Sequence, residues 1–144
     1  MERTSASLGV LPNQVGFNMR RAYFKATLFF GETFADLEIT PMQFAILEVI
    51  GCNEGLAQKN VAELVGTAPS VIVKPVRELE MRKLVGRKRS PDDRRHHVLS
   101  LTTAGKALQQ EAQTRIQEVE NNLLAPLNAD ERAKLLELLH KLLL

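Results

Sequence analysis

Residues 68–105 read APSVIVKPVRELEMRKLVGRKRSPDDRRHHVLSLTTAG, and this stretch determines the fold expected for the whole chain. Its first part is helical in pattern, because Ile72, Val76 and Leu79 recur at spacings of four and three. These three side chains share one apolar face. The pattern predicts a helix that begins near Pro69, with small and charged side chains on the opposite face.

The second part of the stretch changes its period. Residues 84–88 and 97–101 resemble two short strands, and residues 89–95 between them are rich in turn formers and charge. A further helix is expected to start at 102–103. Together with a short helix expected at about 57–65, this order is the outline of a winged helix-turn-helix.

Positive charge is concentrated in the same region. Residues 74–97 contain nine Lys and Arg against four Asp and Glu, about +5, whereas the whole chain carries +2. A solvated charged face is the alternative explanation of such a run. Here the excess is of one sign and lies on a helix and on the hairpin that follows it, which favours contact with nucleic acid.

The motifs of this stretch resemble the wing signature of the MarR family of bacterial transcriptional regulators. That signature places L-V-x-R, D-x-R and L-T-x-x-G in this order, and the chain has them at 84–87, 93–95 and 101–105. Upstream, residues 39–44 (ITPMQF) are similar to the family's entry into its second helix. The resemblance extends from about Val15 to the C-terminus.

The resemblance implies a mainly α fold with a small β-hairpin wing, in a single MarR-type domain over residues 1–144. A winged helix-turn-helix DNA-binding lobe is expected at about 37–101. A helical dimerisation lobe is expected at about 12–36 and 102–144. Such a protein binds pseudo-palindromic double-stranded DNA as a homodimer, most often as a repressor.

In this arrangement the recognition helix enters the major groove, and the wing reaches along the backbone toward the minor groove. Asp93 would repel phosphate, so we expect it to shape the hairpin instead of contacting DNA. The side chains expected to contact DNA are Ser70, Val71, Val73, Lys74, Arg77, Arg87, Lys88, Arg89, Arg94, Arg95 and His96.

The resemblance also implies a site for a small anionic aromatic effector, where the dimer helices meet the DNA-binding lobe. Effector binding would change the spacing of the two recognition helices and weaken DNA binding. On the first helix, Arg20, Arg21 and Tyr23 are the polar groups that fit such a site. Surface charge and core packing are the alternative roles for these three side chains.

The last helix, expected from a capping box at Asn128 to about Leu143, is apolar around most of its circumference. Six leucines lie between residues 135 and 143, and the polar stripe beside them is narrow. The first helix, expected at about 12–35, carries two apolar stripes. A chain of 144 residues has little core in which to bury both helices, so we expect them to pack in a dimer.

Pro75 lies inside the expected recognition helix, beyond its first turn. A proline in a helix interior cannot donate a backbone hydrogen bond and crowds the preceding turn, at a cost of about 3 kcal/mol. We therefore predict a bend or a widened turn near residues 71–75, with Ser70, Val71 and Lys74 still directed toward DNA.

Other functions find little support in the sequence. No nucleophile motif, Gly-rich phosphate loop or pair of carboxylates occurs, so neither an enzyme nor a cofactor or metal site is expected. His96 and His97 are adjacent on a predicted strand and point to opposite faces, which disfavours a shared metal ion. No apolar run approaches 18 residues and the N-terminus lacks a signal-peptide pattern, so the expected compartment is the cytoplasm, without membrane contact.

Two alternative functions remain open at this stage. Cys52, the one cysteine, is expected to be buried in the packing, but a redox-responsive regulator would use this thiol. The second alternative is a winged-helix protein-interaction module that has kept the fold and lost specific DNA binding. A salt-dependent DNA titration distinguishes that module from a DNA-binding regulator.

Overall fold

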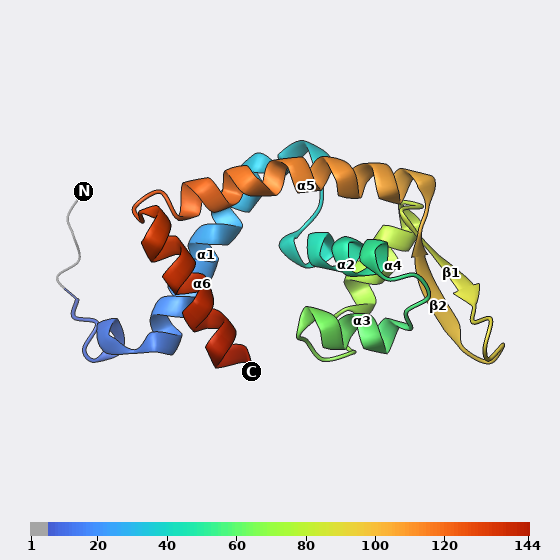
Figure 1. Ribbon diagram of the computed structural model, residues 1–144, viewed down its shortest axis with the longest axis horizontal. Coiled ribbons are helices and arrows are strands. Elements are labelled where there is room, and N and C mark those ends of the chain that lie inside the picture. The colour runs from blue at the N-terminus through green and yellow to red at the C-terminus, as the bar shows by residue number, and fades with distance from the viewer. Residues whose placement is uncertain (1–5) are drawn as a thin grey trace.

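The computed structural model describes residues 6–144, and this part of the chain is mainly helical (Figure 1). Its elements in chain order are η1 (Leu11–Asn13), α1 (Val15–Thr33), η2 (Ala35–Leu37), α2 (Pro41–Cys52), α3 (Gln58–Val65), α4 (Val73–Met81), β1 (Val85–Arg89), β2 (His97–Leu101), α5 (Thr103–Leu123) and α6 (Ala129–Leu143). The two strands form one antiparallel hairpin between α4 and α5. The predicted fold class, mainly α with a small β-hairpin, is confirmed.

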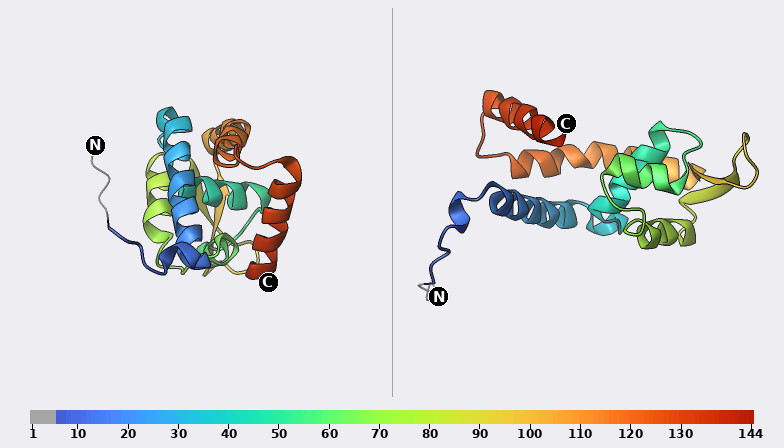
Figure 2. Two further views of the ribbon diagram at one scale, coloured as in Figure 1. Left: turned by 90° about the vertical axis from the view of Figure 1, so that its left-hand side faces the viewer. Right: turned by 90° about the horizontal axis from the view of Figure 1, so that it is seen from below.

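The elements form two parts joined by one long helix (Figures 1 and 2). We call α2, α3, α4 and the hairpin the compact lobe. At the other end α1, α6 and the C-terminal half of α5 form the helical arm. α5 runs along the molecule and packs against α1, so two helices far apart in the sequence are neighbours in space.

The core of the compact lobe is built around the apolar face predicted for the recognition helix. Ile72, Val76 and Leu79 are completely buried, and they pack in one cluster with apolar side chains of α2, α3 and β2. Burial of each such side chain contributes about 1.5–3 kcal/mol. The predicted face is therefore confirmed, and its burial fixes which side of α4 is left open to solvent.

The hairpin is anchored on this core at its root. Val85 pairs with Leu101, and Arg89 pairs with His97 at the outer end of the ladder. Leu99 is buried, and its N–H donates to the Leu56 carbonyl at 2.8 Å, which ties β2 to the chain before α3. The outer end of the hairpin extends beyond the compact lobe (Figure 1).

Two helix starts read from the sequence are present as predicted. At α2 the Thr40 hydroxyl accepts from the Gln43 N–H at 3.1 Å, and the Gln43 side chain accepts from the Thr40 N–H at 3.0 Å. At α6 Asn128 and Glu131 make the same reciprocal pair, with both distances at 2.9 Å. Each capping box satisfies two N–H groups that a helix start would otherwise leave unpaired.

The recognition helix begins later than predicted. Residues 69–72 form turns, in which the Val71 N–H donates to the Ala68 carbonyl at 3.0 Å, and α4 starts at Val73. Pro75 is therefore the third residue of the helix. The first four N–H groups of a helix have no intrahelical partner, so a proline here removes no hydrogen bond. The predicted start near residue 69 was wrong. A turn does lie at residues 69–72, but it precedes the helix, so the bend expected from an interior proline does not occur.

The helical arm leaves most of its apolar side chains open to solvent in the single chain. No residue of α6 is buried, and Leu138 and Leu142 are 46% and 66% exposed. On α1 only Phe30 is buried, whereas Phe24 and Leu28 are more than half exposed. The burial expected for these two helices does not occur within one chain.

Candidate nucleic-acid interface

The solvent face of α4, with the turn before it, carries the side chains predicted to face DNA bases. Val73, Lys74 and Arg77 are spaced so that they share one side of the helix, and Ser70 and Val71 precede them in the turn. All five are exposed because the buried apolar face lies opposite. The Lys74 side chain is 86% exposed, so its ammonium group is available to a partner.

A buried amide connects this helix to the start of α2. Gln43 is only 4% exposed, and its side-chain amide donates to Glu78 of α4 at 2.9 Å while its oxygen completes the cap at Thr40. Glu78 in turn lies 3.9 Å from the Lys74 ammonium. Sequence reasoning assigned Gln43 to the capping box alone and missed its contact with the recognition helix, because the two residues are 35 positions apart.

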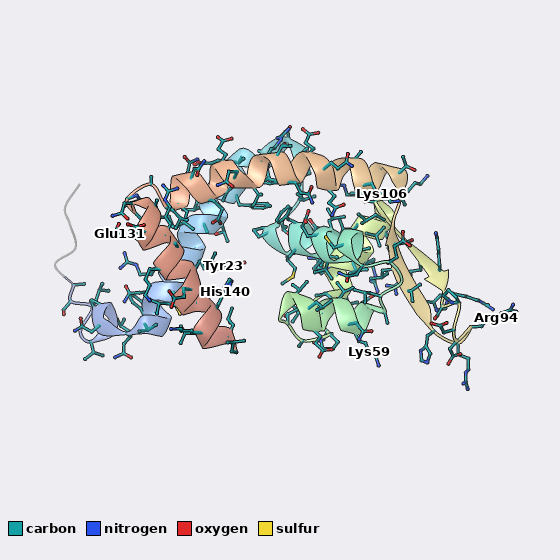
Figure 3. All side chains as sticks on the ribbon, in the orientation of Figure 1. Tyr23, Lys59, Arg94, Lys106, Glu131 and His140 are labelled. Carbon is teal, nitrogen blue, oxygen red and sulfur yellow. The ribbon has the colours of Figure 1, made fainter. Side chains whose placement is uncertain are left out.

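Asp93 organises the tip of the hairpin. Its carboxylate accepts from the Arg95 backbone N–H at 3.0 Å and from the Arg95 side chain at 3.3 Å, and it lies 3.5 Å from His96 Nε2. The Arg95 N–H and side chain, with His96, hold the pKa of Asp93 below its usual range. Asp93 is thus a local partner that shapes the hairpin. Arg94 is exposed at the outermost part of the wing (Figure 3).

The cations of β1 differ in what they contact. Arg87 bridges three elements, since its guanidinium donates to Glu80 of α4 and to Gln58 of α3, each at 2.5 Å. Lys88 and Arg89 are exposed. They line a cavity of about 480 Å³ between the hairpin and the end of α2, to which α5 contributes Lys106. Arg87, a member of the predicted DNA-contact set, is therefore engaged with two other elements of the protein.

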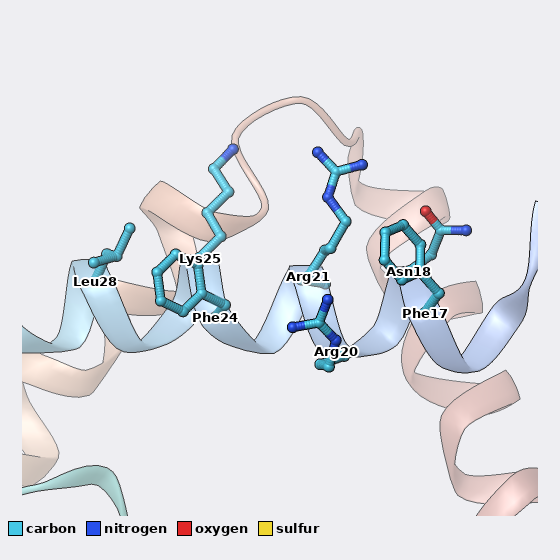
Figure 4. A pocket seen from close by; sticks show the side chains of 8 residues that line it. Phe17, Asn18, Arg20, Arg21, Phe24, Lys25 and Leu28 are labelled. Carbon is cyan, nitrogen blue, oxygen red and sulfur yellow. The ribbon is translucent and has the colours of Figure 1, made fainter. Parts of the chain in front are cut away.

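The residues predicted to bind an effector lie on the exposed side of α1. A concavity of about 520 Å³ runs along this helix (Figure 4). Arg20 and Arg21 line it, and their guanidinium carbons lie 5.4 and 5.7 Å from the centre of the Phe17 ring. Tyr23 is 64% exposed and does not line the concavity. The structure thus brings two of the three predicted residues together around an aromatic ring.

Cys52 is exposed at the end of α2, so the expectation that it would be buried was wrong. The last buried side chain of this helix is Ile50, and the chain leaves the core after it. Within residues 6–144, no three His, Cys, Asp or Glu side chains gather closely enough to hold a metal ion. Over the same residues, every helix is too short or too polar to cross a membrane.

Comparison with known proteins identifies close relatives of this architecture. Residues 39–97 match the MarR family. A transcriptional regulatory protein for the hcr operon of Thauera aromatica is 33% identical over 135 residues, which cover 93% of this chain and 81% of that protein.

Two solved structures are similar over nearly the whole chain. The transcriptional repressor CouR, bound to a 23-mer DNA duplex, has a TM-score of 0.88 at 31% identity, covering 98% of this chain and 100% of that one. BpsR of Bordetella bronchiseptica, whose structure concerns regulation of its DNA binding by 6-hydroxynicotinic acid, has a TM-score of 0.82 at 28% identity, covering 90% and 98%.

Proposed function

The chain belongs to the MarR family and is a transcriptional regulator, and we propose that it is a homodimeric repressor that binds pseudo-palindromic duplex DNA and releases it when a small aromatic acid binds. This function consists of binding equilibria and includes no catalytic step. It places the protein in the cytoplasm, where its DNA lies. In this proposal residues 37–101 are the DNA-binding lobe, and residues 12–36 and 102–144 form the dimerisation lobe.

The observation that carries this proposal is the exposed face of α4 beside a cationic hairpin. A structure similar over 98% of this chain, that of CouR, was solved on a DNA duplex. We place α4 in the major groove, where Lys74 and Arg77 donate hydrogen bonds to base edges or phosphates. The methyl groups of Val71 and Val73 suit contacts with thymine methyl groups, although valine makes no bidentate base contact.

The hairpin supplies affinity more than sequence readout. Arg94 extends from its tip. Arg95 and His96 contact the Asp93 carboxylate, and the wing keeps a net positive charge. Lys88 and Arg89 add charge along β1. Contacts of this kind reach phosphates and are largely independent of base sequence.

A second copy of the chain is the partner that the helical arm requires. Apolar side chains of α1 and α6 are exposed in one chain, and an uncovered apolar surface of this extent marks a protein interface. Two-fold symmetry presents two copies of α4 to one face of the duplex. The half-site centres are then expected about one helical turn apart, roughly 10 base pairs.

The effector site in this proposal is the concavity on α1. Arg20 and Arg21 offer planar donors to a carboxylate, and Phe17 offers a ring face to an aromatic group. The concavity is open in the single chain and is closed when a second copy packs on α1. The relative BpsR is regulated by 6-hydroxynicotinic acid, an aromatic acid of this kind.

The experiment that tests the proposal is selection of bound sites from random duplex DNA, followed by titration of the selected site at several salt concentrations. Binding that weakens steeply with salt is expected. Arg94→Ala should weaken binding to all sequences alike and reduce the salt slope by about 1. Lys141→Ala, on α6, is the matched control and should leave the slope unchanged.

The effector is tested by repeating the titration with a panel of aromatic acids. At least one acid should weaken DNA binding by the unmodified protein, and Arg20→Ala or Arg21→Ala should abolish that response while leaving DNA affinity intact. Failure to enrich any sequence would favour a protein-interaction module, and a response only to oxidants would favour regulation through Cys52.

A further inference from the structure

One short segment, residues 34–40, connects α1 of the helical arm to α2 of the compact lobe. Phe34 anchors it in the core, where its ring stacks on Phe30 with centroids 4.0 Å apart. Glu38 follows η2 with a φ of 50°, in the left-handed region that side chains rarely adopt. This segment, which we call the junction, is therefore held in one defined conformation.

The arm holds the junction from one side. Arg115 of α5 donates to the Thr33 carbonyl at 3.3 Å and to Asp36 Oδ2 at 3.0 Å, and it also pairs with Glu111 one turn earlier. The hydrogen bonds from Arg115 lower the pKa of Asp36, so this carboxylate stays ionised at neutral pH. The start of the junction thus moves with α5.

The recognition helix holds the junction from the other side. Arg82 is the residue after the last turn of α4, and its guanidinium donates to the Glu38 carbonyl at 2.7 Å and to the Leu37 carbonyl at 3.0 Å. One planar group spans two consecutive carbonyls, a geometry that a lysine ammonium does not reproduce. The C-terminal end of α4 is thereby fixed to the segment that Arg115 fixes to the arm.

From these contacts we infer that Arg82 is a positioning residue for DNA recognition, which sets the place of the recognition helix relative to the helical arm. The inference rests on the proposed function. Arg82 belongs by sequence to the cationic region, but its guanidinium is directed to the junction. In a dimer built on the arms, the position of each α4 relative to its arm determines the separation of the two recognition helices, and hence the half-site spacing that the protein accepts.

The test compares Arg82→Lys and Arg82→Ala with the unmodified protein on the selected site and on versions of it with one base pair added to or removed from the centre. Both variants are expected to bind the original spacing about three- to tenfold more weakly, from the loss of charge-assisted hydrogen bonds to carbonyls. They should also discriminate less between the three spacings, and the salt slope should not change.

Arg94→Ala is the matched control. It should lower the salt slope by about 1 and keep the spacing preference, because Arg94 acts on phosphate. The fraction of folded, DNA-competent protein is measured for each variant by stoichiometric titration.

Three outcomes would overturn the assignment of Arg82. The first is a drop of about 1 in the salt slope for Arg82→Ala with recovery in Arg82→Lys, which would make Arg82 a phosphate contact. The second is an unchanged spacing preference in both variants, and the third is an affinity loss fully explained by a smaller competent fraction. Absence of salt-dependent DNA binding by the unmodified protein would instead refute the proposed function, together with this inference.

Discussion

Gly105 is expected to be the least replaceable glycine of the chain, because the start of α5 passes directly over the backbone of Leu84, the residue before β1. A Cβ atom at this position would lie 2.9 Å from the Leu84 carbonyl carbon and closer still to its oxygen, whereas 3.4 Å is the lower end of ordinary contact. The carbonyl carbon would have to move by about 0.5 Å, and its oxygen by more. That carbonyl accepts the Thr102 N–H at 3.0 Å, so the shift also weakens the hydrogen bond that joins the hairpin to α5.

The magnitude follows from these contacts. Overpacking costs about 1–3 kcal/mol, and loss of one hydrogen bond adds about 0.5–1.5 kcal/mol. Alanine is favoured over glycine in a helix by about 1 kcal/mol, which offsets part of the cost. Gly105→Ala should therefore lower the free energy of unfolding by about 2 kcal/mol and Tm by about 4–8 °C.

The assay is thermal unfolding followed by circular dichroism at one fixed protein concentration. Gly31→Ala is the matched control, because a Cβ atom there meets nothing within 4 Å and the residue is also helical. It should raise Tm by about 2–4 °C, from helix propensity alone. A Tm for Gly105→Ala equal to or above that of the unmodified protein would show that the close approach to Leu84 is not what requires glycine.

Three further changes test other parts of the structure. Arg115 holds the folded pKa of Asp36 below its unfolded value of about 3.9, so the pair stabilises the fold above that pH and is lost as pH falls through the folded pKa. Asp36→Asn should thus lower Tm at pH 7, with a difference that vanishes at strongly acid pH; a difference that persists there would contradict the ion-pair explanation. Truncation after Leu127 should give aggregated or unfolded protein in light scattering, because α6 is then missing from the proposed dimer and the apolar face of α1 stays uncovered; a well-folded monomer would refute the dimer argument. Pro75→Ala should lower stability by only about 0.4–1 kcal/mol in denaturant titration, since a first-turn proline acts through the unfolded chain; a clear gain in stability would restore the interior-proline interpretation.

Features that depend on residues three or four positions apart could be predicted from the sequence. The buried face of α4 and the capping boxes at Thr40 and Asn128 are of this kind. The start of α4 was not predictable from periodicity, because Ile72 keeps the apolar spacing although it lies in a turn before the helix. Pro75 itself indicated the later start, since proline is tolerated in a first turn.

The roles of the arginines needed the structure. Counting charge places Arg82, Arg87 and Arg94 in one cationic region. Their roles differ, because Arg82 and Arg87 contact partners that are distant in sequence. The carbonyl acceptors of Arg82 lie 44 and 45 residues away in sequence, and Gln58 lies 29 residues from Arg87. Arg94, by contrast, is directed outward from the tip of the hairpin (Figure 3). No local pattern reports such contacts, so charge alone overstates the number of side chains free to contact phosphate.

The packing of α1 on α5 also has a consequence for synthesis of the chain. α5 begins 70 residues after α1 ends, an interval of about 4–14 s at ordinary translation rates. The compact lobe is contiguous and can form its core on the ribosome during that time. α1 meanwhile lacks α5, the helix that packs against it in the folded chain. A chain released by a premature stop before residue 103 therefore combines a folded DNA-reading lobe with an uncovered helix, a product prone to aggregation and suited to removal by proteases.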